Sequence, residues 1–175
     1  PLGGRHSVVD RNGRLLALDE ERFRLWAHPI IFRFPGDSHE KIRSSSEVAQ
    51  KLSALLGKSS EELISVFDSN SSGVRVAEGL SPEIASEIRG LQISGLDLQP
   101  YPQRVYPQGE LFANVIGFLN DDRIPQAGLE QSLNKKLLRQ EKSYTLRRGG
   151  VVEESGVFKG DDYELELTLD SRLQK

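Results

Sequence analysis

Apolar residues recur at helical spacing in three stretches of the first half of the chain. A start signal precedes each stretch. Two of the signals are serine–glutamate capping boxes, in which each side chain satisfies the backbone amide of the other residue. The third is a serine followed by proline and glutamate, which favour the first turn of a helix. We therefore predict helices that begin near Ser44-x-x-Glu47, Ser59-x-x-Glu62 and Ser81-Pro82-Glu83.

Shorter apolar runs and alternating patterns predict strands. Asn12-Gly13 lies between two apolar runs, and this dipeptide is a strong hairpin signal because both residues tolerate φ above zero. Apolar and polar residues alternate from 163 to 169, so one face of that strand is expected to be buried. Residues 19–28 are charged and mixed around Trp26. The predicted strands are residues 8–9, 15–17, 30–34, 74–76 and 163–169, with an extended run from 93 to 98.

A turn followed by a short helix is predicted around residues 104–117. Pro107 suits the second position of a type I turn and Gly109 its fourth. The apolar residues after the turn are spaced by four, which predicts one buried face, and Gly117 is expected to end the helix. That face comprises Leu111, Phe112, Val115 and Ile116.

The last third of the chain contains one more helix signal and one more hairpin signal. Leu129, Leu133 and Leu137 are spaced by four residues, which predicts a helix over about residues 128–138. Residues 143–158 are interpreted as a hairpin that turns at Gly149-Gly150.

The order of these elements predicts an α+β fold in two parts. Residues 29–104 read strand, helix, helix, strand, helix, strand, which describes an α+β subdomain inserted into the rest of the chain. Residues 5–28 and 105–170 are expected to form an elongated base of antiparallel strands and short helices. Residues 1–4 are interpreted as a cloning remnant, and residues 171–175 as the first residues of a further helix.

Composition excludes several classes of function. The 175 residues carry a net charge of -3, which argues against a nucleic-acid binder because such a protein needs a basic surface. The chain has no cysteine, and its three histidines form no metal-ligand spacing. No run approaches the roughly 18 apolar residues that a membrane-spanning helix requires. The sequence therefore predicts no metal site, no cofactor and no nucleic-acid partner.

Two Ser-x-x-Lys sequences resemble the nucleophile motif of serine acyl-transferases. They are Ser38/Lys41 and Ser132/Lys135. The companion motifs of that class, Ser-Asp-Asn and Lys-Thr-Gly, are absent, so both matches are interpreted as chance. A stand-alone acyl-transferase that uses Ser132 and Lys135 remains one alternative. A glycan-binding module is another, although aromatic residues make up only 7% of the chain.

Three ordered motifs resemble those of the N-terminal, non-penicillin-binding module of class B penicillin-binding proteins. The spacing within and around them is most similar to the division-specific, FtsI-type members. The terminal residues 167–174 are similar to the entry into that family's transpeptidase domain. The motif residues are Arg5, Asp10, Arg11, Asn12 and Gly13 in the first motif, Arg104, Tyr106, Pro107, Gly109 and Gly117 in the second, and Gly128 and Glu130 in the third.

The resemblance implies a pedestal without catalytic residues of its own. In such proteins the module lies outside the cytoplasmic membrane, after a single membrane helix and before a penicillin-sensitive D,D-transpeptidase domain. It is expected to position that domain at the septum and to contact divisome partners, including an FtsW-type glycosyltransferase, and a dimer is compatible with this role. The alternative within the class is the same module from an elongation-type synthase.

The charged members of the three motifs prompt a physical hypothesis. Arg5, Arg104 and Glu130 come from distant parts of the chain. An arginine can donate two hydrogen bonds to one carboxylate, so two arginines can share one glutamate. We therefore predict a partly buried ion-pair cluster that joins the three motifs.

Overall fold

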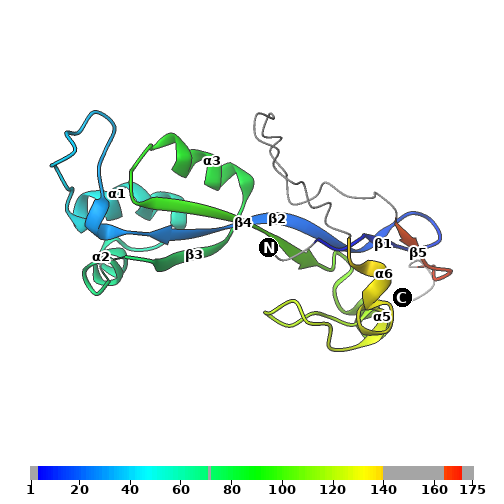
Figure 1. Ribbon diagram of the computed structural model, residues 1–175. Helices are drawn as coiled ribbons and strands as arrows, with labels where there is room; N and C mark the ends of the chain where they lie inside the picture. Colours follow the sequence, from blue (N-terminus) through cyan, green and yellow to red (C-terminus); the bar gives the residue numbers. More distant parts are fainter. Residues whose placement is uncertain (1–3, 71, 140–163, 171–175) are drawn as a thin grey trace, which may run out of the picture. The chain divides into compact units, whose positions relative to one another are not determined.

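The computed structural model describes residues 4–70, 72–139 and 164–170, except for the side chains of residues 110 and 111 (Figure 1). The chain divides into two compact units. Unit 1 comprises Pro1–Glu20 and Pro102–Lys175, and unit 2 comprises Glu21–Tyr101. Strands β2 (Leu15–Ala27) and β4 (Leu96–Val105) contain residues of both units and pair with each other. The mixture of sheet and short helices confirms the predicted α+β class.

The helices of unit 2 begin at the serines that the sequence marks. The capping box at Ser44 is complete, because its Oγ accepts from the Glu47 amide at 3.4 Å and its own amide donates to the Glu47 carboxylate at 3.1 Å. Ser59 and Ser81 likewise accept from amides three residues on. The predicted helix starts are therefore confirmed. The helices are α1 (Ser45–Leu56), α2 (Ser60–Asp68) and α3 (Pro82–Gly90).

Strand β2 is much longer than predicted. Its second part pairs antiparallel with β3 (Val74–Leu80), with Phe23 opposite Leu80 and Ala27 opposite Val74. Phe23, Leu25 and Ala27 are buried, and the residues between them are half-buried. The alternation that defines a half-buried strand is thus present within residues 19–28, where the charged side chains obscured it.

The predicted strand at residues 30–34 is wrong. Pro29–Ile31 form a 3-10 helix, η1, and Arg33 makes an isolated bridge to Ser94. Pro29 has no amide hydrogen for a strand ladder and its fixed φ suits the first position of a helix. Ile30 and Ile31 are exposed, whereas Phe32 is completely buried. This apolar run therefore forms a turn from which only Phe32 enters the core.

Unit 2 is built around one large apolar core. The buried rings of Phe32 and Phe67 meet edge to face, with centroids 5.2 Å apart. Helices α1 to α3 supply one side of this core and strands β2 and β3 the other. Its fully buried members are Phe23, Leu25, Ala27, Phe32, Val48, Ala49, Leu52, Leu63, Phe67, Val76, Leu80, Ala85, Ile88 and Ile93.

Unit 1 combines two strand pairings with short helices. Strand β1 (Val8–Val9) pairs antiparallel with the start of β2, which confirms the predicted hairpin. It pairs parallel with β5 (Leu165–Glu166), so the expectation of purely antiparallel strands is wrong for this pair. The predicted alternation is present from 164 to 169, but its inner face is half-buried rather than buried, and only Leu165–Glu166 form a strand. The hairpin predicted at residues 143–158 lies outside the described residues.

The helices of unit 1 are shorter than the sequence indicates. The helix predicted over 128–138 is divided at Leu133, whose φ and ψ are -108° and 19°. Its apolar face survives in part, because Leu137 is completely buried. The small core of this unit comprises Val8, Leu16, Ala17, Phe112, Ile116 and Leu137. The helices are η2 (Gly109–Phe112), α4 (Ala113–Ile116), α5 (Gly128–Ser132) and α6 (Asn134–Leu137).

Candidate functional site

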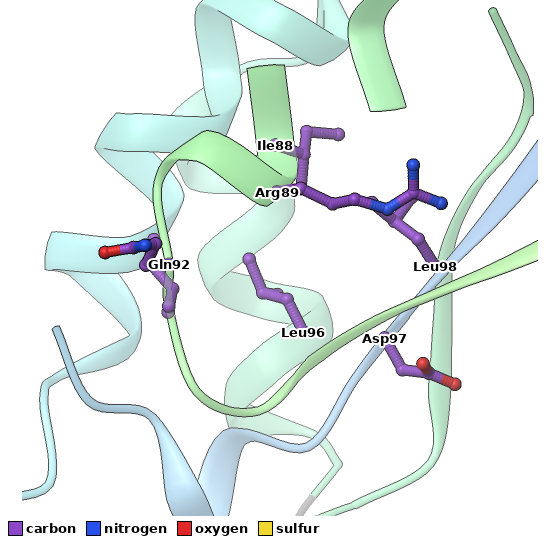
Figure 2. Close-up of a pocket in the computed structure, with 7 residues that line it drawn as sticks. Ile88, Arg89, Gln92, Leu96, Asp97 and Leu98 are labelled. Atoms are coloured by element: carbon purple, nitrogen blue, oxygen red, sulfur yellow. The ribbon is translucent and has the colours of Figure 1, made fainter. Parts of the chain in front are cut away.

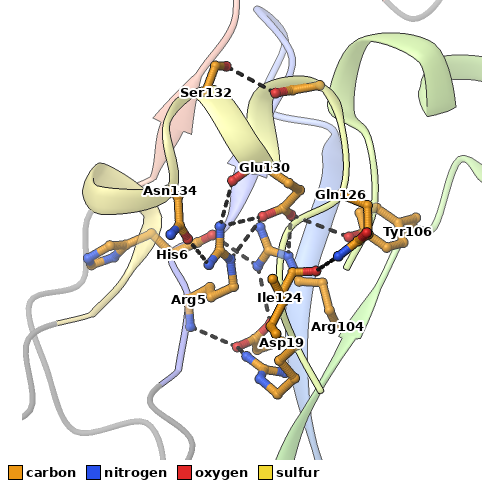
Figure 3. Close-up of polar contacts among 12 residues, drawn as sticks. Arg5, His6, Asp19, Arg104, Tyr106, Ile124, Gln126, Glu130, Ser132 and Asn134 are labelled. Atoms are coloured by element: carbon orange, nitrogen blue, oxygen red, sulfur yellow. Dashed lines mark hydrogen bonds and ion pairs between the residues drawn. The ribbon is translucent and has the colours of Figure 1, made fainter. Parts of the chain in front are cut away.

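The charged residues of the three motifs meet inside unit 1 (Figure 3). One carboxylate oxygen of Glu130 lies 2.7 Å from Arg5 Nη2, and the other lies 2.8 Å from Arg104 Nε. Arg5 Nε adds a second hydrogen bond of 2.9 Å to the first oxygen. The side chains of Arg5, Arg104 and Glu130 are 2%, 3% and 0% exposed. The predicted meeting of these side chains therefore occurs, and it is fully rather than partly buried.

Asp19 is a second carboxylate in the same network. Its Oδ1 lies 3.3 Å from Arg104 Nη1, and its Oδ2 accepts from the Arg5 backbone amide at 2.7 Å. Arg123 Nη2 also donates to Oδ2, at 2.8 Å. Sequence reasoning missed Asp19 because it begins a run of three acidic residues, which is typical of a solvated surface. It missed Arg123 because the residue lies outside the three motifs.

Backbone and amide groups add further hydrogen bonds to the two buried arginines. The side-chain oxygen of Asn134 accepts from Arg5 Nη1 at 2.7 Å, and the Glu130 carbonyl accepts from Arg5 Nη2 at 3.1 Å. The His6 carbonyl accepts from Arg104 Nη1 at 3.1 Å. A buried charge is tolerated only when it is paired and hydrogen-bonded. All three guanidinium nitrogens of Arg5 meet that condition, whereas Arg104 Nη2 is buried without a hydrogen-bond partner among the described residues.

Backbone hydrogen bonds between two segments that are distant in the sequence bring these side chains together. Residues 4–6 run alongside residues 137–139, with hydrogen bonds from the His6 amide to the Leu137 carbonyl and from the Arg139 amide to the Gly4 carbonyl. Arg5 is thereby placed against the α5–α6 segment that carries Glu130. Arg104 reaches the same carboxylate from the end of β4.

The environment of the network alters the pKa of two of its members. Burial lowers the pKa of the Arg5 guanidinium, and the charge of Glu130 opposes this effect. Burial, followed by the nearby Glu130 carboxylate, raises the pKa of Tyr106 to about 12. The Tyr106 hydroxyl is therefore neutral at physiological pH and donates to Glu130 Oε1 over 3.5 Å.

Two motif glycines allow a close approach of two backbones. Gly117 and Gly128 have φ of 76° and 62°. A Cβ atom on Gly117 would lie 1.9 Å from the Ala127 carbonyl oxygen, and one on Gly128 would lie 2.6 Å from the Gly117 amide nitrogen. The end of α4 and the start of α5 therefore touch directly, which only glycine permits at both positions.

The predicted turn at residues 106–109 is present. The Gly109 amide donates to the Tyr106 carbonyl at 2.9 Å, which closes the turn around Pro107. Phe112 and Ile116 are buried as expected, but Val115 is 37% exposed. The helix is too short for four apolar residues to face the core.

The remaining motif residues belong to the β1–β2 turn. The Asp10 carboxylate is buried and accepts from the Asn12 and Arg14 amides at 2.8 and 2.9 Å. Asn12 does not share the positive φ of Gly13, so the expectation for both turn residues holds only for the glycine. The carboxylate stabilises a longer turn instead. The Arg11 amide donates to the Leu169 carbonyl at 3.0 Å, which links this turn to the end of β5.

Unit 2 contains a shallow pocket of about 320 Å³ beside α3 and β4 (Figure 2). Four of its seven lining residues are apolar, but most of its exposed lining surface is polar, and Arg89 and Asp97 are its ionisable members. The Arg89 guanidinium lies 4.9 Å from the centre of the Phe23 ring. One carboxylate and one guanidinium do not provide the pair of groups that acid–base chemistry requires. Within the described residues, no group of three histidine, aspartate or glutamate side chains could hold a metal ion.

Comparisons with known proteins agree with the motifs. The family model described as "Penicillin-binding Protein dimerisation domain" matches residues 2–173. The chain belongs to this family. It is 33% identical, over 98% of its length, to a protein named peptidoglycan D,D-transpeptidase FtsI homolog from Mesostigma viride. It is 30% identical, over 97% of its length, to peptidoglycan D,D-transpeptidase FtsI of Escherichia coli strain K12.

These relatives are considerably longer than the chain. The chain spans 28% of the length of the Mesostigma protein and 29% of that of the E. coli protein. It therefore corresponds to the dimerisation domain of this family, and the names of the relatives describe proteins that contain more than this domain.

Solved structures of penicillin-binding proteins share the fold. A peptidoglycan synthetase from Bifidobacterium adolescentis superposes with a TM-score of 0.59 at 22% identity, over 98% of this chain and 36% of that one. Penicillin Binding Protein 2X from Streptococcus thermophilus superposes with a TM-score of 0.60 at 22% identity, over 78% of this chain and 23% of that one. Across the described residues, no helix has the length and apolar character needed to span a membrane.

The Ser-x-x-Lys sequences do not form a nucleophile site in this dimerisation domain. Ser132 Oγ donates to the Gly128 carbonyl at 3.0 Å, and Ser132 and Lys135 lie on separate helices on either side of the break at Leu133. Ser38 and Lys41 are exposed residues of one loop turn, closed by the Lys41 amide and the Ser38 carbonyl. An acyl-transferase serine needs an adjacent base, and neither serine has the geometry that supplies one.

Proposed function

We propose that this domain is the non-catalytic scaffold of a septal peptidoglycan transpeptidase. In this role it holds the catalytic domain at a fixed position outside the membrane and contacts other proteins of the division machinery, including an FtsW-type glycosyltransferase. The family match, together with relatives named FtsI, supports this proposal. An elongation-type synthase is the alternative within the same class.

The observation that carries the proposal is the buried network around Glu130. It joins the two chain segments of unit 1 through Arg5 and Asp19 on one side and Arg104 and Glu130 on the other, using charges that perform no chemistry. Buried ionic networks specify one arrangement of the segments that they connect, and a scaffold requires such an arrangement. The expected division into a base of residues 5–28 and 105–170 and a head of residues 29–104 belongs to the same proposal.

A role in protein contacts follows from the family description. Self-association is one form that such contacts can take, and binding to membrane-anchored division proteins is another. The proposal also includes an extracytoplasmic location through an anchor that precedes the domain. The full-length protein is then a penicillin-sensitive D,D-transpeptidase.

A chimera can test the septal role. The matching segment of E. coli FtsI is replaced by this chain, and the fluorescently tagged chimera is expressed while native FtsI is depleted. We expect the chimera to collect at the septum and to support division. Covalent labelling of the chimera by a fluorescent penicillin reports separately that its catalytic domain is folded.

Two results would contradict the proposal. One is a chimera that labels with penicillin but spreads along the side wall. The other is covalent penicillin labelling of this chain alone, which would favour the acyl-transferase alternative. A chimera that carries Glu130→Gln is the matched control, because it keeps the surface of the domain and weakens the buried network. It is expected to label with penicillin and to lose septal enrichment.

A further inference from the structure

Residues 118–126 form a small hairpin at the surface of unit 1. Leu119 and Pro125 form an antiparallel bridge, and the Gln126 amide donates to the Phe118 carbonyl at 2.9 Å. At the tip, the Asn120 amide donates to the Ile124 carbonyl at 3.0 Å, and the Asn120 side chain accepts from the Ile124 amide at 2.8 Å. Local hydrogen bonds thus define the hairpin, but a two-stranded hairpin is at best marginally stable by itself, so these bonds open readily once the hairpin is detached.

Little apolar burial holds this hairpin against the rest of unit 1. Phe118 and Ile124 are 53% and 55% exposed and lie on the same face, since the pairs 118/126 and 120/124 are two positions apart in the ladder. Leu119 and Pro125, on the other face, are only half-buried. Movement of the hairpin would therefore uncover little additional apolar surface.

Polar contacts instead attach the hairpin to unit 1. Arg123 reaches inward from the tip, and its guanidinium donates to the Pro102 carbonyl and to Asp19 Oδ2. The backbone of Leu119 also hydrogen-bonds the Tyr106 hydroxyl. The Arg123 side chain is 10% exposed, and its φ of 62° is unusual for a residue with a side chain. The backbone adopts this conformation while the charged group is turned toward Asp19.

The network beneath the hairpin keeps its partners if Arg123 leaves. Asp19 still accepts from the Arg5 amide and from Arg104, and Glu130 keeps both of its arginines. The released Arg123 would be hydrated like any surface arginine. Loss of Glu130, in contrast, would leave two buried guanidinium groups without their shared carboxylate.

We propose that Arg123 is a releasable strap, that is, a side chain whose ion pair with Asp19 holds the 118–126 hairpin against the rest of unit 1. When this ion pair breaks, the hairpin moves away, while the Arg5–Glu130–Arg104 cluster stays intact. The backbone contact between Gly117 and Gly128 fixes the base of the hairpin and acts as its hinge. A molecule that binds the open or the closed form more tightly would shift this equilibrium. The inference is independent of the septal role.

Amide hydrogen exchange of the whole chain tests the strap in a way that global unfolding does not. In Arg123→Gln, which keeps the backbone strain but removes the charge, the protected amides of residues 120, 123, 124 and 126 are expected to exchange at least about tenfold faster. Amides of residues 4–10 and of unit 2 should keep their wild-type rates. Arg123→Lys, which keeps the charge but not the planar fork, should lie between the two.

Ionic strength and a control variant sharpen this test. High salt should speed hairpin exchange only modestly in the wild type and not at all in Arg123→Gln, because the wild-type ion pair is largely buried and salt screens buried pairs weakly. Arg75→Gln is the matched control, since Arg75 is 54% exposed and belongs to unit 2. Unchanged exchange in Arg123→Gln would overturn the proposal. A uniform increase throughout unit 1 would also overturn it, since Arg123 would then be a general structural support.

Discussion

The two units of this chain are stabilised in different ways. Unit 2 has a large apolar core, and each ion pair described there has at least one side chain that is 20% exposed or more, as with Arg24–Glu78 at 20% and 41% exposure. Unit 1 has a small apolar core beside a buried network of three arginines and two carboxylates. An apolar core tolerates many substitutions of similar volume, whereas removal of the carboxylate that two buried arginines share leaves both charges uncompensated. Unit 1 should therefore depend on single residues to a degree that unit 2 does not.

Glu130→Ala should have the largest effect. The substitution leaves Arg5 and Arg104 buried without their common carboxylate, which costs on the order of 3–5 kcal/mol. Chemical denaturation followed by circular dichroism gives the change in unfolding free energy. Hydrogen exchange should place the loss in unit 1. Glu166→Ala, at an exposed position of β5, is the control and should change little. A Glu130→Ala chain that melts within about a degree of wild type would show that the network contributes little to stability.

Leu52→Ala should have a comparable or slightly smaller effect, but in unit 2. Leu52 is completely buried in α1, and removal of a buried leucine side chain costs about 2–5 kcal/mol. Exchange should accelerate in residues 21–101, while the Glu130 network stays protected. Leu138→Ala, at 43% exposure, is the matched control. Equal loss of protection in both units would mean that they unfold as one cooperative body, and the contrast between them would lose its thermodynamic meaning.

Gly117→Ala should destabilise unit 1 by an intermediate amount. The new Cβ would collide with the Ala127 carbonyl oxygen, and the residue must also keep a positive φ. Together these two effects should lower the free energy of unfolding by at least about 1–3 kcal/mol. Gly13→Ala separates the two causes, because Gly13 has φ of 76° but no atom within 4 Å of the added Cβ. Thermal melts of both variants should rank Gly117→Ala as the less stable. If Gly13→Ala were the less stable variant, the contact with the Ala127 backbone could not be the cause of the lost stability.

Asp37→Asn should have the smallest effect, and one that depends on pH. The Arg43 guanidinium, followed by the Phe34 amide, lowers the pKa of the Asp37 carboxyl from 3.8 to about 2. Because the folded pKa is the lower one, the carboxylate stabilises unit 2 fully above pH 3.8, and this contribution is lost as the pH falls toward 2. The difference in urea midpoint between wild type and Asp37→Asn should shrink over that range. Arg43→Gln should reproduce it, and a difference that persists at pH 2 would contradict the ion pair as its source.

Local signals explain what could be predicted from the sequence. The helix starts at Ser44, Ser59 and Ser81 depend on contacts within four residues, so the side chains that make them are visible in the sequence. The errors come from places where local and distant preferences conflict. Residues 30–34 have the composition of a strand, but Pro29 starts a short helix and only Phe32 enters the core. The charged residues of β2 concealed a strand because its partner, β3, lies some fifty residues away in the chain.

The sequence by itself determined the family, the helix starts, the turn at Pro107 and the pairing hypothesis for Arg5, Arg104 and Glu130. Each of these depends on residue types at fixed spacing. Only the tertiary structure decided that Asp19 is a buried partner rather than a surface acid, and that Arg123 reaches it from a residue with positive φ. A carboxylate looks the same in the sequence whether water or a guanidinium surrounds it. Its role depends on which distant donors the fold brings within hydrogen-bonding distance.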